Sequence, residues 1–203
     1  MARNDHDLRS KEKGIRMNEV VSENVSCAIA MLREVAGLEA QMSAAASLIS
    51  TALLCGHKLL ACGNGGSAAD ASHLTTEFVS RFKEDRRPYP AISLAANGGD
   101  LTAIGNDYAF EELFSRQVRA FGASGDVLAA FTTSGRSENV RRALIAAKEL
   151  SVKTIAFLGR DGGQCTGLAD IELLVLSDVT ARIQEGHKFM LHTICEMVEL
   201  QLR

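Results

Sequence analysis

A histidine and a glutamate, His73 and Glu77, stand four residues apart in a stretch with helical spacing, directly after a glycine-rich loop. Residues four apart share one face of a helix, so the imidazole and the carboxylate are expected side by side. The preceding segment, 58–62, has the pattern of a short buried strand, and Gly63-Asn-Gly-Gly66 lets the backbone approach a ligand closely. Ser67 is expected to cap the helix, whose free N–H groups and positive dipole end suit a phosphate. The stretch predicts a site for a phosphorylated small molecule beside titratable groups.

A second loop repeats this architecture later in the chain. The apolar run 126–131 is followed by Thr132-Thr-Ser-Gly-Arg-Ser137, and Glu138 then opens a helical pattern. Hydroxyls and Gly135 around a helix N-terminus suit a dianionic phosphate without demanding a metal. The alternative is a polar loop in which Ser137 is an ordinary N-cap. The first loop matches neither the P-loop nor the complete dinucleotide fingerprint, so neither motif identifies the ligand.

Short apolar runs alternate with longer helical patterns from residue 58 onward. This alternation is typical of βαβ units and predicts an α/β fold with a parallel sheet. Both loops then follow strands, at the edge where open α/β sheets bind ligands. The expected strands are 58–62, 91–94, 126–131, 153–158 and 171–176. The helices expected between them are 68–80, 101–106 with 111–120, and 138–150.

Further helices are expected at both ends of the chain. Apolar residues recur at helical spacing through 18–54, with a break near Gly37, and again through 182–202. The apolar residues of the last segment cover more than one narrow face. Because a small sheet domain cannot cover so much apolar helix alone, we expect the N- and C-terminal helices to form an oligomeric helical bundle.

Length and composition narrow the class of protein. With 203 residues, 46% of them hydrophobic, the chain can bury one core, and we expect a single domain over 17–203. The polar tail that precedes it, 1–16, has a composition compatible with disorder. A net charge of −3 with dispersed basic residues gives no footprint for nucleic acid or a membrane, and no apolar run is long enough to span a bilayer. Five single cysteines without CxxC spacing indicate reduced core residues in a cytoplasmic protein: Cys27, Cys55, Cys62, Cys165 and Cys195.

Four motifs occur in order: GNGGSAADASHLTTEF, LTAIGNDYAFEELFSRQV, GDVLAAFTTSGRSENV and ARIQEGHKFMLH. Together they resemble bacterial phosphoheptose isomerases, from about residue 52 to the C-terminus. These are sugar isomerase (SIS) domain proteins, so the resemblance implies a three-layer, doubly wound sheet of mainly parallel strands. It also implies an isomerase that converts sedoheptulose 7-phosphate to D-glycero-D-manno-heptose 7-phosphate in a cytoplasmic homotetramer. That reaction is the first step of ADP- or GDP-heptose biosynthesis, which supplies lipopolysaccharide and other heptose-containing glycans.

The resemblance also implies roles for particular residues. Glu77 and His192 match the catalytic pair, with Glu77 moving a proton between C1 and C2 and His192 managing the oxygen proton or ring opening. An enediol route needs such a base at carbon and a proton donor at oxygen. The loop 132–137 would hold the phosphate, and the loop 63–66 would hold the sugar. His187 lies in the same motif as His192 but does not match the catalytic histidine. The substrate-binding positions are Asn64, Gly65, Gly66, Ser67, Arg81, Asn97, Thr132, Thr133, Ser134, Ser137 and Gln184.

Some family members also bind zinc, through residues that match His73, Glu77, Gln184 and His192. Ligands four apart on one helix and eight apart on another are geometrically compatible with one ion. The metal would polarise substrate oxygens, but it would compete with Glu77 acting as a free base. Since glutamine is an unusual zinc ligand, we expect one weakly held or exchangeable divalent ion per subunit.

Two departures from the family pattern leave the choice of sugar open. Asn97 stands where many of these isomerases have an aspartate, with Asp100 three residues later, and Ala181 replaces an active-site aspartate of some members. An isomerase of another sugar phosphate therefore stays an alternative. So does a non-catalytic SIS protein of the type that binds the replication initiator DnaA, although that type lacks the residues corresponding to Glu77 and His192.

Overall fold

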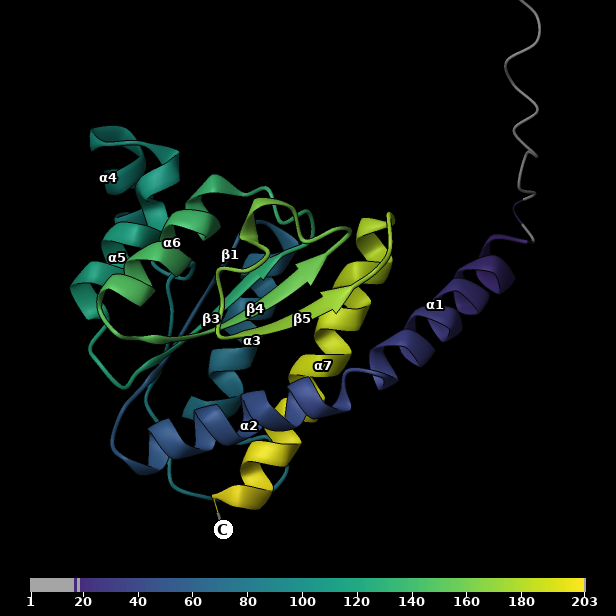
Figure 1. The fold of residues 1–203 in the computed structure, drawn as a ribbon, viewed down its shortest axis with the longest axis horizontal. Helices are drawn as coiled ribbons and strands as arrows, with labels where there is room; N and C mark the ends of the chain where they lie inside the picture. The colour runs from purple at the N-terminus through teal and green to yellow at the C-terminus, as the bar shows by residue number, and fades with distance from the viewer. Residues whose placement is uncertain (1–16, 18, 203) are drawn as a thin grey trace, which may run out of the picture.

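The computed structural model describes residue 17 and residues 19–202, so the expected polar tail, 1–16, lies outside the described residues. One sheet of five parallel strands forms the centre, in the order β2-β1-β3-β4-β5 (Figure 1). The expected strands are confirmed, with each end within one residue of its expected position. They are β1 (Leu59–Gly63), β2 (Ala91–Ser93), β3 (Val127–Thr132), β4 (Lys153–Gly159) and β5 (Ile171–Val175).

The expected helices are confirmed as well. The break near Gly37 separates α1, which ends at Ala36, from α2, which begins at Glu39. The helices are α1 (Val20–Ala36), α2 (Glu39–Leu54), α3 (Gly66–Val79), α4 (Gly98–Asp107), α5 (Leu113–Phe121), α6 (Glu138–Glu149) and α7 (Thr180–Gln201), with short 3-10 turns η1 (Phe110–Glu112) and η2 (Gly163–Cys165).

Two apolar cores lie on opposite faces of the sheet, because successive side chains of a strand point to opposite sides. Leu59 and Ala61 of β1 join the core covered by α2, α3 and α7, whereas Leu60 and Cys62 join the core covered by α4, α5 and α6. β3 and β4, in the middle of the sheet, are buried over nearly their whole length. The three-layer α/β architecture expected from the sequence is therefore confirmed (Figure 1).

The chain reverses its direction across the sheet between β1 and β3. After β1 it moves outward to β2, and it then returns to form β3 on the other side of β1. At such a switch point the connections leaving two neighbouring strands diverge, and the crevice between them is the usual ligand site of an open α/β sheet. The loops that follow β1 and β3 are the two glycine-containing loops of the sequence, so the fold brings both to this crevice.

Helix α1 extends away from the body of the protein (Figure 1). Its C-terminal half packs through the buried side chains of Met31 and Val35, and Arg182 of α7 donates to the carbonyl of Asn24. Cys27 lies on the projecting part and is exposed, as is Cys55 at the end of α2. The expectation that all five cysteines are core residues is therefore wrong for these two.

None of the described helices is long and apolar enough to cross a membrane.

The expected N-cap of α3 is also wrong. Ser67 does not cap the helix, because the helix begins one residue earlier, at Gly66, with Gly65 as the N-cap. Gly65 has a φ of +55°, a conformation that glycine adopts without a Cβ penalty, and it turns the chain into the helix ahead of Ser67. Ser67 is consequently buried within the first turn.

His187 lies fully buried on the inward side of α7. Its ring contacts Phe131 and Phe157 edge-on, and its Nε2 donates to the carbonyl of Leu158 at 2.9 Å. Burial lowers its pKa to about 4, against the opposing effect of that hydrogen bond. The residue is thus a neutral core histidine that packs beneath the sheet.

This burial predicts a loss of stability in mild acid. Between pH 6.5 and 4 the unfolded chain binds a proton at His187 that the folded chain excludes, so the free energy of unfolding falls as the pH falls. We expect this group to lower the unfolding free energy by about 2 kcal/mol between pH 7 and pH 5. Urea unfolding of the wild type and of His187→Phe at both pH values measures it. The explanation fails if the variant loses as much stability as the wild type.

Candidate active site

The loop after β1 is joined to the start of α6 by a pair of amides. Asn64 Nδ2 donates to Asn139 Oδ1 at 2.9 Å, and Asn139 Nδ2 donates back to Asn64 Oδ1 at 2.8 Å. Asn139 is buried, and its Oδ1 also accepts from the backbone N–H of Val140. The reciprocal pair crosses the crevice and fixes the first loop relative to the second. Asn139 is not among the site residues expected from the sequence, although it lies only two residues beyond the second loop.

The second loop brings the hydroxyls of Thr132 and Ser137 together at the N-terminus of α6. Thr132 Oγ1 lies 3.2 Å from Ser137 Oγ and accepts from the backbone N–H of Gly135, while Ser134 Oγ accepts from the N–H of Arg136. Ser137 is the N-cap of α6, but its hydroxyl makes no capping bond to the helix. The loop thus combines hydroxyl donors with the positive end of a helix, which is an arrangement that suits a phosphate.

Glu138, the first residue of α6, carries a charge that would oppose an anion at this loop. Its carboxylate accepts from Arg141 Nε at 2.7 Å and from Arg142 Nε at 2.8 Å. These hydrogen bonds, first from Arg141 and then from Arg142, lower the pKa of Glu138 to about 2. The two guanidinium groups therefore offset the carboxylate beside the proposed phosphate position.

Three of the expected chemical groups meet between α3 and α7. His73 Nε2 lies 2.8 Å from Glu77 Oε1 and 3.2 Å from His192 Nε2, and the ring of Phe82 stacks on His192 with centroids 5.7 Å apart. The i, i+4 spacing on α3 thus sets the first pair, and tertiary packing adds His192. All three side chains are partly buried, so a ligand can reach them while the protein screens part of each from water.

The same three groups fit a divalent metal. One ligand atom from each of His73, Glu77 and His192 lies within 4.8 Å of the others. Zinc bonds of 2.0–2.2 Å to nitrogen and oxygen place neighbouring ligand atoms about 3.3 Å apart, close to the distances seen here. Burial lowers the pKa of His192 below its ordinary value, and His73 and Lys188 lower it further, against the opposite effect of the nearby carboxylates. A neutral imidazole suits either coordination or proton exchange.

Two charged residues that the sequence analysis did not single out border this cluster. Lys188 Nζ lies 2.7 Å from Asp70 Oδ1 and 3.0 Å from His73 Nδ1. The spacing carried a signal for both: Asp70 precedes His73 by three residues on α3, and Lys188 precedes His192 by four on α7. The spacing does not show that the face of α3 with Asp70 and the face of α7 with Lys188 lie opposite each other.

Gln184 lines an open groove beside the cluster of His73, Glu77 and His192. A Cβ atom at Gly66 would lie 2.1 Å from Gln184 Nε2, so the glycine leaves room for the end of this side chain to lie against the helix start. Ala181 lines the same groove and contributes no polar side chain to it. The groove has a volume of about 330 Å³ and is lined by Gly66, Asp70, Ala181, Gln184, Glu185 and Lys188.

Arg81 and Asn97 are not brought into the cluster. Helix α3 ends at Val79, so Arg81 lies beyond the helix, exposed, and its guanidinium donates to the carbonyl of Lys83 at 3.0 Å. Asn97 is the N-cap of α4: its Oδ1 accepts from the N–H of Gly99, and its Nδ2 donates to Asp100. Local backbone structure therefore accounts for the observed contacts of both residues.

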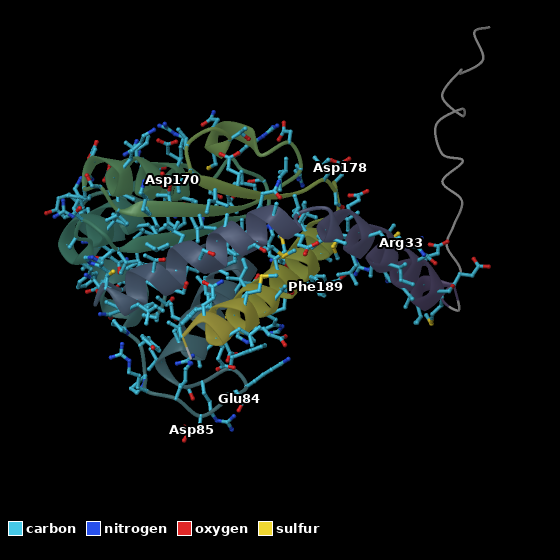
Figure 2. All side chains as sticks on the ribbon, turned by 60° about the horizontal axis from the view of Figure 1, so that its bottom comes forward. Arg33, Glu84, Asp85, Asp170, Asp178 and Phe189 are labelled. Atoms are coloured by element: carbon cyan, nitrogen blue, oxygen red, sulfur yellow. The ribbon has the colours of Figure 1, made fainter. Side chains whose placement is uncertain are left out.

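The loop after α3, where Figure 2 labels Glu84 and Asp85, ties the two cluster-bearing helices together. Arg86 donates to the carbonyls of Glu77 and Phe78 at the end of α3, at 2.7 and 3.1 Å. Glu199, near the end of α7, lies 3.4 Å from Arg86 and accepts from the backbone N–H groups of 82–84. These bonds hold the backbone of Glu77 in a fixed position relative to α7.

Comparison with known proteins gives this geometry a family context. A family model described as SIS domain matches residues 25–159. The phosphoheptose isomerase of Citrifermentans bemidjiense is 51% identical over 165 residues, which are 81% of this chain and 86% of that protein.

Solved structures agree with the sequence relatives. The phosphoheptose isomerase of Neisseria gonorrhoeae superposes with a TM-score of 0.86 at 40% identity, covering 91% of this chain and all of that one. The phosphoheptose isomerase of Francisella tularensis gives a TM-score of 0.88 at 35% identity, covering 91% of this chain and 99% of that one. The residues matched by the family model include both loops and α3 of the candidate site.

Proposed function

The chain belongs to the phosphoheptose isomerases of the SIS-domain family, and we propose that it interconverts sedoheptulose 7-phosphate and D-glycero-D-manno-heptose 7-phosphate. The observation that carries this proposal is the meeting of Glu77 and His192 from two helices, beside His73, next to the crevice between two anion-suited loops. A carboxylate and an imidazole at one point supply the two proton-transfer groups of an aldose–ketose exchange.

In this proposal the substrate lies across the crevice. The hydroxyls and helix end of the 132–137 loop bind the phosphate, through Thr132, Thr133, Ser134 and Ser137. Asn64, Gly65, Gly66 and Ser67 face the sugar chain, with Gln184 on the groove side. Because Asn139 anchors Asn64 and Gly66 accommodates Gln184, these contacts are supported by the surrounding structure. Arg81 and Asn97 would need to move to contact the same substrate.

The proposed chemistry is a proton transfer through an enediol. Glu77 takes a proton from C1 of the ketose, the C–H electrons form the C1–C2 double bond, and His192 donates a proton to the oxygen at C2. His192 then takes back the proton of the C1 oxygen as the aldehyde forms, and Glu77 returns its proton to C2, so both groups end in their starting protonation states. Atoms and electrons balance without an external oxidant, as an isomerisation requires.

We also propose a zinc ion as the cofactor, held by His73, Glu77, Gln184 and His192. When bound, it would polarise the substrate oxygens and stabilise negative charge on the enediolate. The nitrogen and oxygen donors support this assignment, because they are the ligands that zinc accepts in proteins.

Self-association as a homotetramer is part of the proposal. Helix α1 projects from the body and exposes Val20, Val21, Val25 and Ile29, and Phe189 on α7 is also exposed (Figures 1 and 2). An apolar surface of this kind is typical of an interface, and a second copy of the chain has the same helices to offer. Sedimentation equilibrium should give the mass of four chains. The mass of one chain would contradict it.

The remaining parts of the proposal concern the setting of the reaction. We propose that the protein acts in the cytoplasm as one domain over 17–203, without a nucleic-acid or membrane partner. Its product would enter ADP- or GDP-heptose biosynthesis. The dispersed charge and the reduced cysteines support this setting.

Incubation of the purified protein with sedoheptulose 7-phosphate tests the activity. Aldose formation, followed by nuclear magnetic resonance, is the expected result, with slower turnover of ketose phosphates that have shorter chains. Equal turnover of shorter ketose phosphates would overturn the heptose assignment alone. An inert protein that binds DnaA would instead support the non-catalytic alternative.

A further inference from the structure

Lys188 brings a positively charged side chain to the candidate metal site. It lies on α7, one turn after Gln184 and one turn before His192, and its ammonium contacts both Asp70 and His73. The Asp70 side chain is 6% exposed, so this carboxylate is held in the interior with the ammonium as its ion-pair partner. The ammonium of Lys188 is therefore held by its ion pair with Asp70 and lies in contact with His73.

The contact with His73 determines which imidazole nitrogen carries the proton. A lysine ammonium has three donors and no acceptor, so the Nδ1 atom 3.0 Å from Nζ must accept. A neutral imidazole that accepts at Nδ1 carries its hydrogen on Nε2. His73 Nε2 lies 2.8 Å from Glu77 Oε1, which is a carboxylate acceptor, so the hydrogen bonds run from Lys188 to His73 and from His73 to Glu77.

Zinc requires the opposite arrangement. The Nε2 atom of His73 points toward Glu77 and His192, so it is the nitrogen that would coordinate, and it must then be free of hydrogen. The hydrogen moves to Nδ1, which in metal-bound histidines donates to a carboxylate, a carbonyl or water. Here Nδ1 faces an ammonium, which cannot accept, and whose charge also repels a divalent cation.

We propose that Lys188 opposes metal binding: it holds His73 as a donor to Glu77, and zinc enters only when the ammonium releases His73 and pairs with Asp70 alone. This inference rests on the proposed zinc site. It assigns the weakness of that site to a residue of this chain, in addition to the glutamine ligand. It also gives the metal-free state a defined structure, in which Glu77 accepts a hydrogen bond and a lysine supplies the positive charge.

Zinc affinity of the full-length protein, measured by competition with a chromophoric chelator, tests the proposal. Lys188→Met keeps the aliphatic stem and removes the donor, and it should bind zinc at least about tenfold more tightly than the wild type, a change of the size that ligand-orienting residues produce. Lys83→Met is the matched control, because Lys83 is also paired with a glutamate, Glu196, but lies outside the cluster. It should leave the affinity unchanged.

A double variant separates the two possible causes of a gain. Lys188→Met leaves Asp70 without its partner, and this freed carboxylate could attract zinc or destabilise the fold. Lys188→Met with Asp70→Asn removes both charges, so a gain that persists there comes from the lost contact with His73. A gain that disappears in the double variant would overturn the proposal in favour of simple charge.

The remaining outcomes are also distinguishable. Equal zinc affinity in all variants overturns the role of Lys188 and leaves the metal site standing, whereas no binding in any variant overturns the metal site and this inference with it. Nitrogen-15 shifts of the metal-free wild type give a readout that needs no metal. They should show His73 protonated at Nε2, and protonation at Nδ1 would contradict the proposal.

Discussion

The Glu77→Gln variant is expected to lose about 10²- to 10⁴-fold in kcat for heptose phosphate isomerisation, with a small change in KM. This range is what a positioned general base contributes. Glutamine has nearly the same shape, and its carbonyl oxygen can still accept the hydrogen bond from His73 that Glu77 Oε1 receives at 2.8 Å. The variant therefore keeps the cluster assembled while it removes the group that takes the proton. Aldose formation at saturating substrate measures the loss.

Two controls separate this explanation from a loss of structure or of metal. Glu196→Gln changes an exposed glutamate of α7 that pairs with Lys83 outside the cluster, and it should retain full activity. Assays with added zinc show whether weaker metal binding accounts for the effect of Glu77→Gln. Incorporation of solvent deuterium at C1 should fall together with kcat. If the variant exchanges this proton at the wild-type rate, another group is the base.

The strands and helices were predictable because burial leaves a periodic record. β3 is buried throughout and β4 is buried except at Lys153, and both strands are mostly apolar. The break between α1 and α2 falls at a glycine. Helix α3 begins two residues before its expected start at residue 68, because the backbone conformation of Gly65, rather than a capping side chain, begins the helix. The expected helix, 68–80, stops just before Arg81, and the observed helix ends at Val79. Helix ends depend on local conformation that hydrophobic periodicity does not record.

The candidate site was predictable to the extent that its residues share one element. His73 and Glu77 follow from their spacing on α3 alone, whereas His192 lies more than 100 residues away and entered only through the family resemblance. The contact of Lys188 with Asp70 depends on how α3 and α7 face each other. That orientation is set by side-chain packing over the sheet, with the Arg86 and Glu199 bonds at the helix ends. Spacing on one helix carries no information about it.

Gly135→Ala is the substitution from which we expect the largest loss of stability among the glycine positions discussed. Gly135 has a φ of +63°, which costs an alanine about 1–2 kcal/mol. A Cβ atom there would also lie 1.9 Å from the carbonyl oxygen of Gly162. Because the obstacle is backbone, it cannot rotate aside, and the loop must separate from the turn before η2. That movement breaks the hydrogen bond from Cys165 N–H to the carbonyl of Gly135.

The expected consequence reaches the substrate through the phosphate loop. Displacing Gly135 moves the hydroxyls of Thr132 and Ser137, so kcat/KM should fall by at least about 10²-fold and the free energy of unfolding by more than about 3 kcal/mol. Gly56→Ala is the matched control: Gly56 has a φ of +84°, but its Cβ would meet nothing within 4 Å. It should show only the conformational cost. Urea unfolding and steady-state kinetics of both variants decide the matter, because equal losses would mean that the close approach of Gly162 does not hold the phosphate loop.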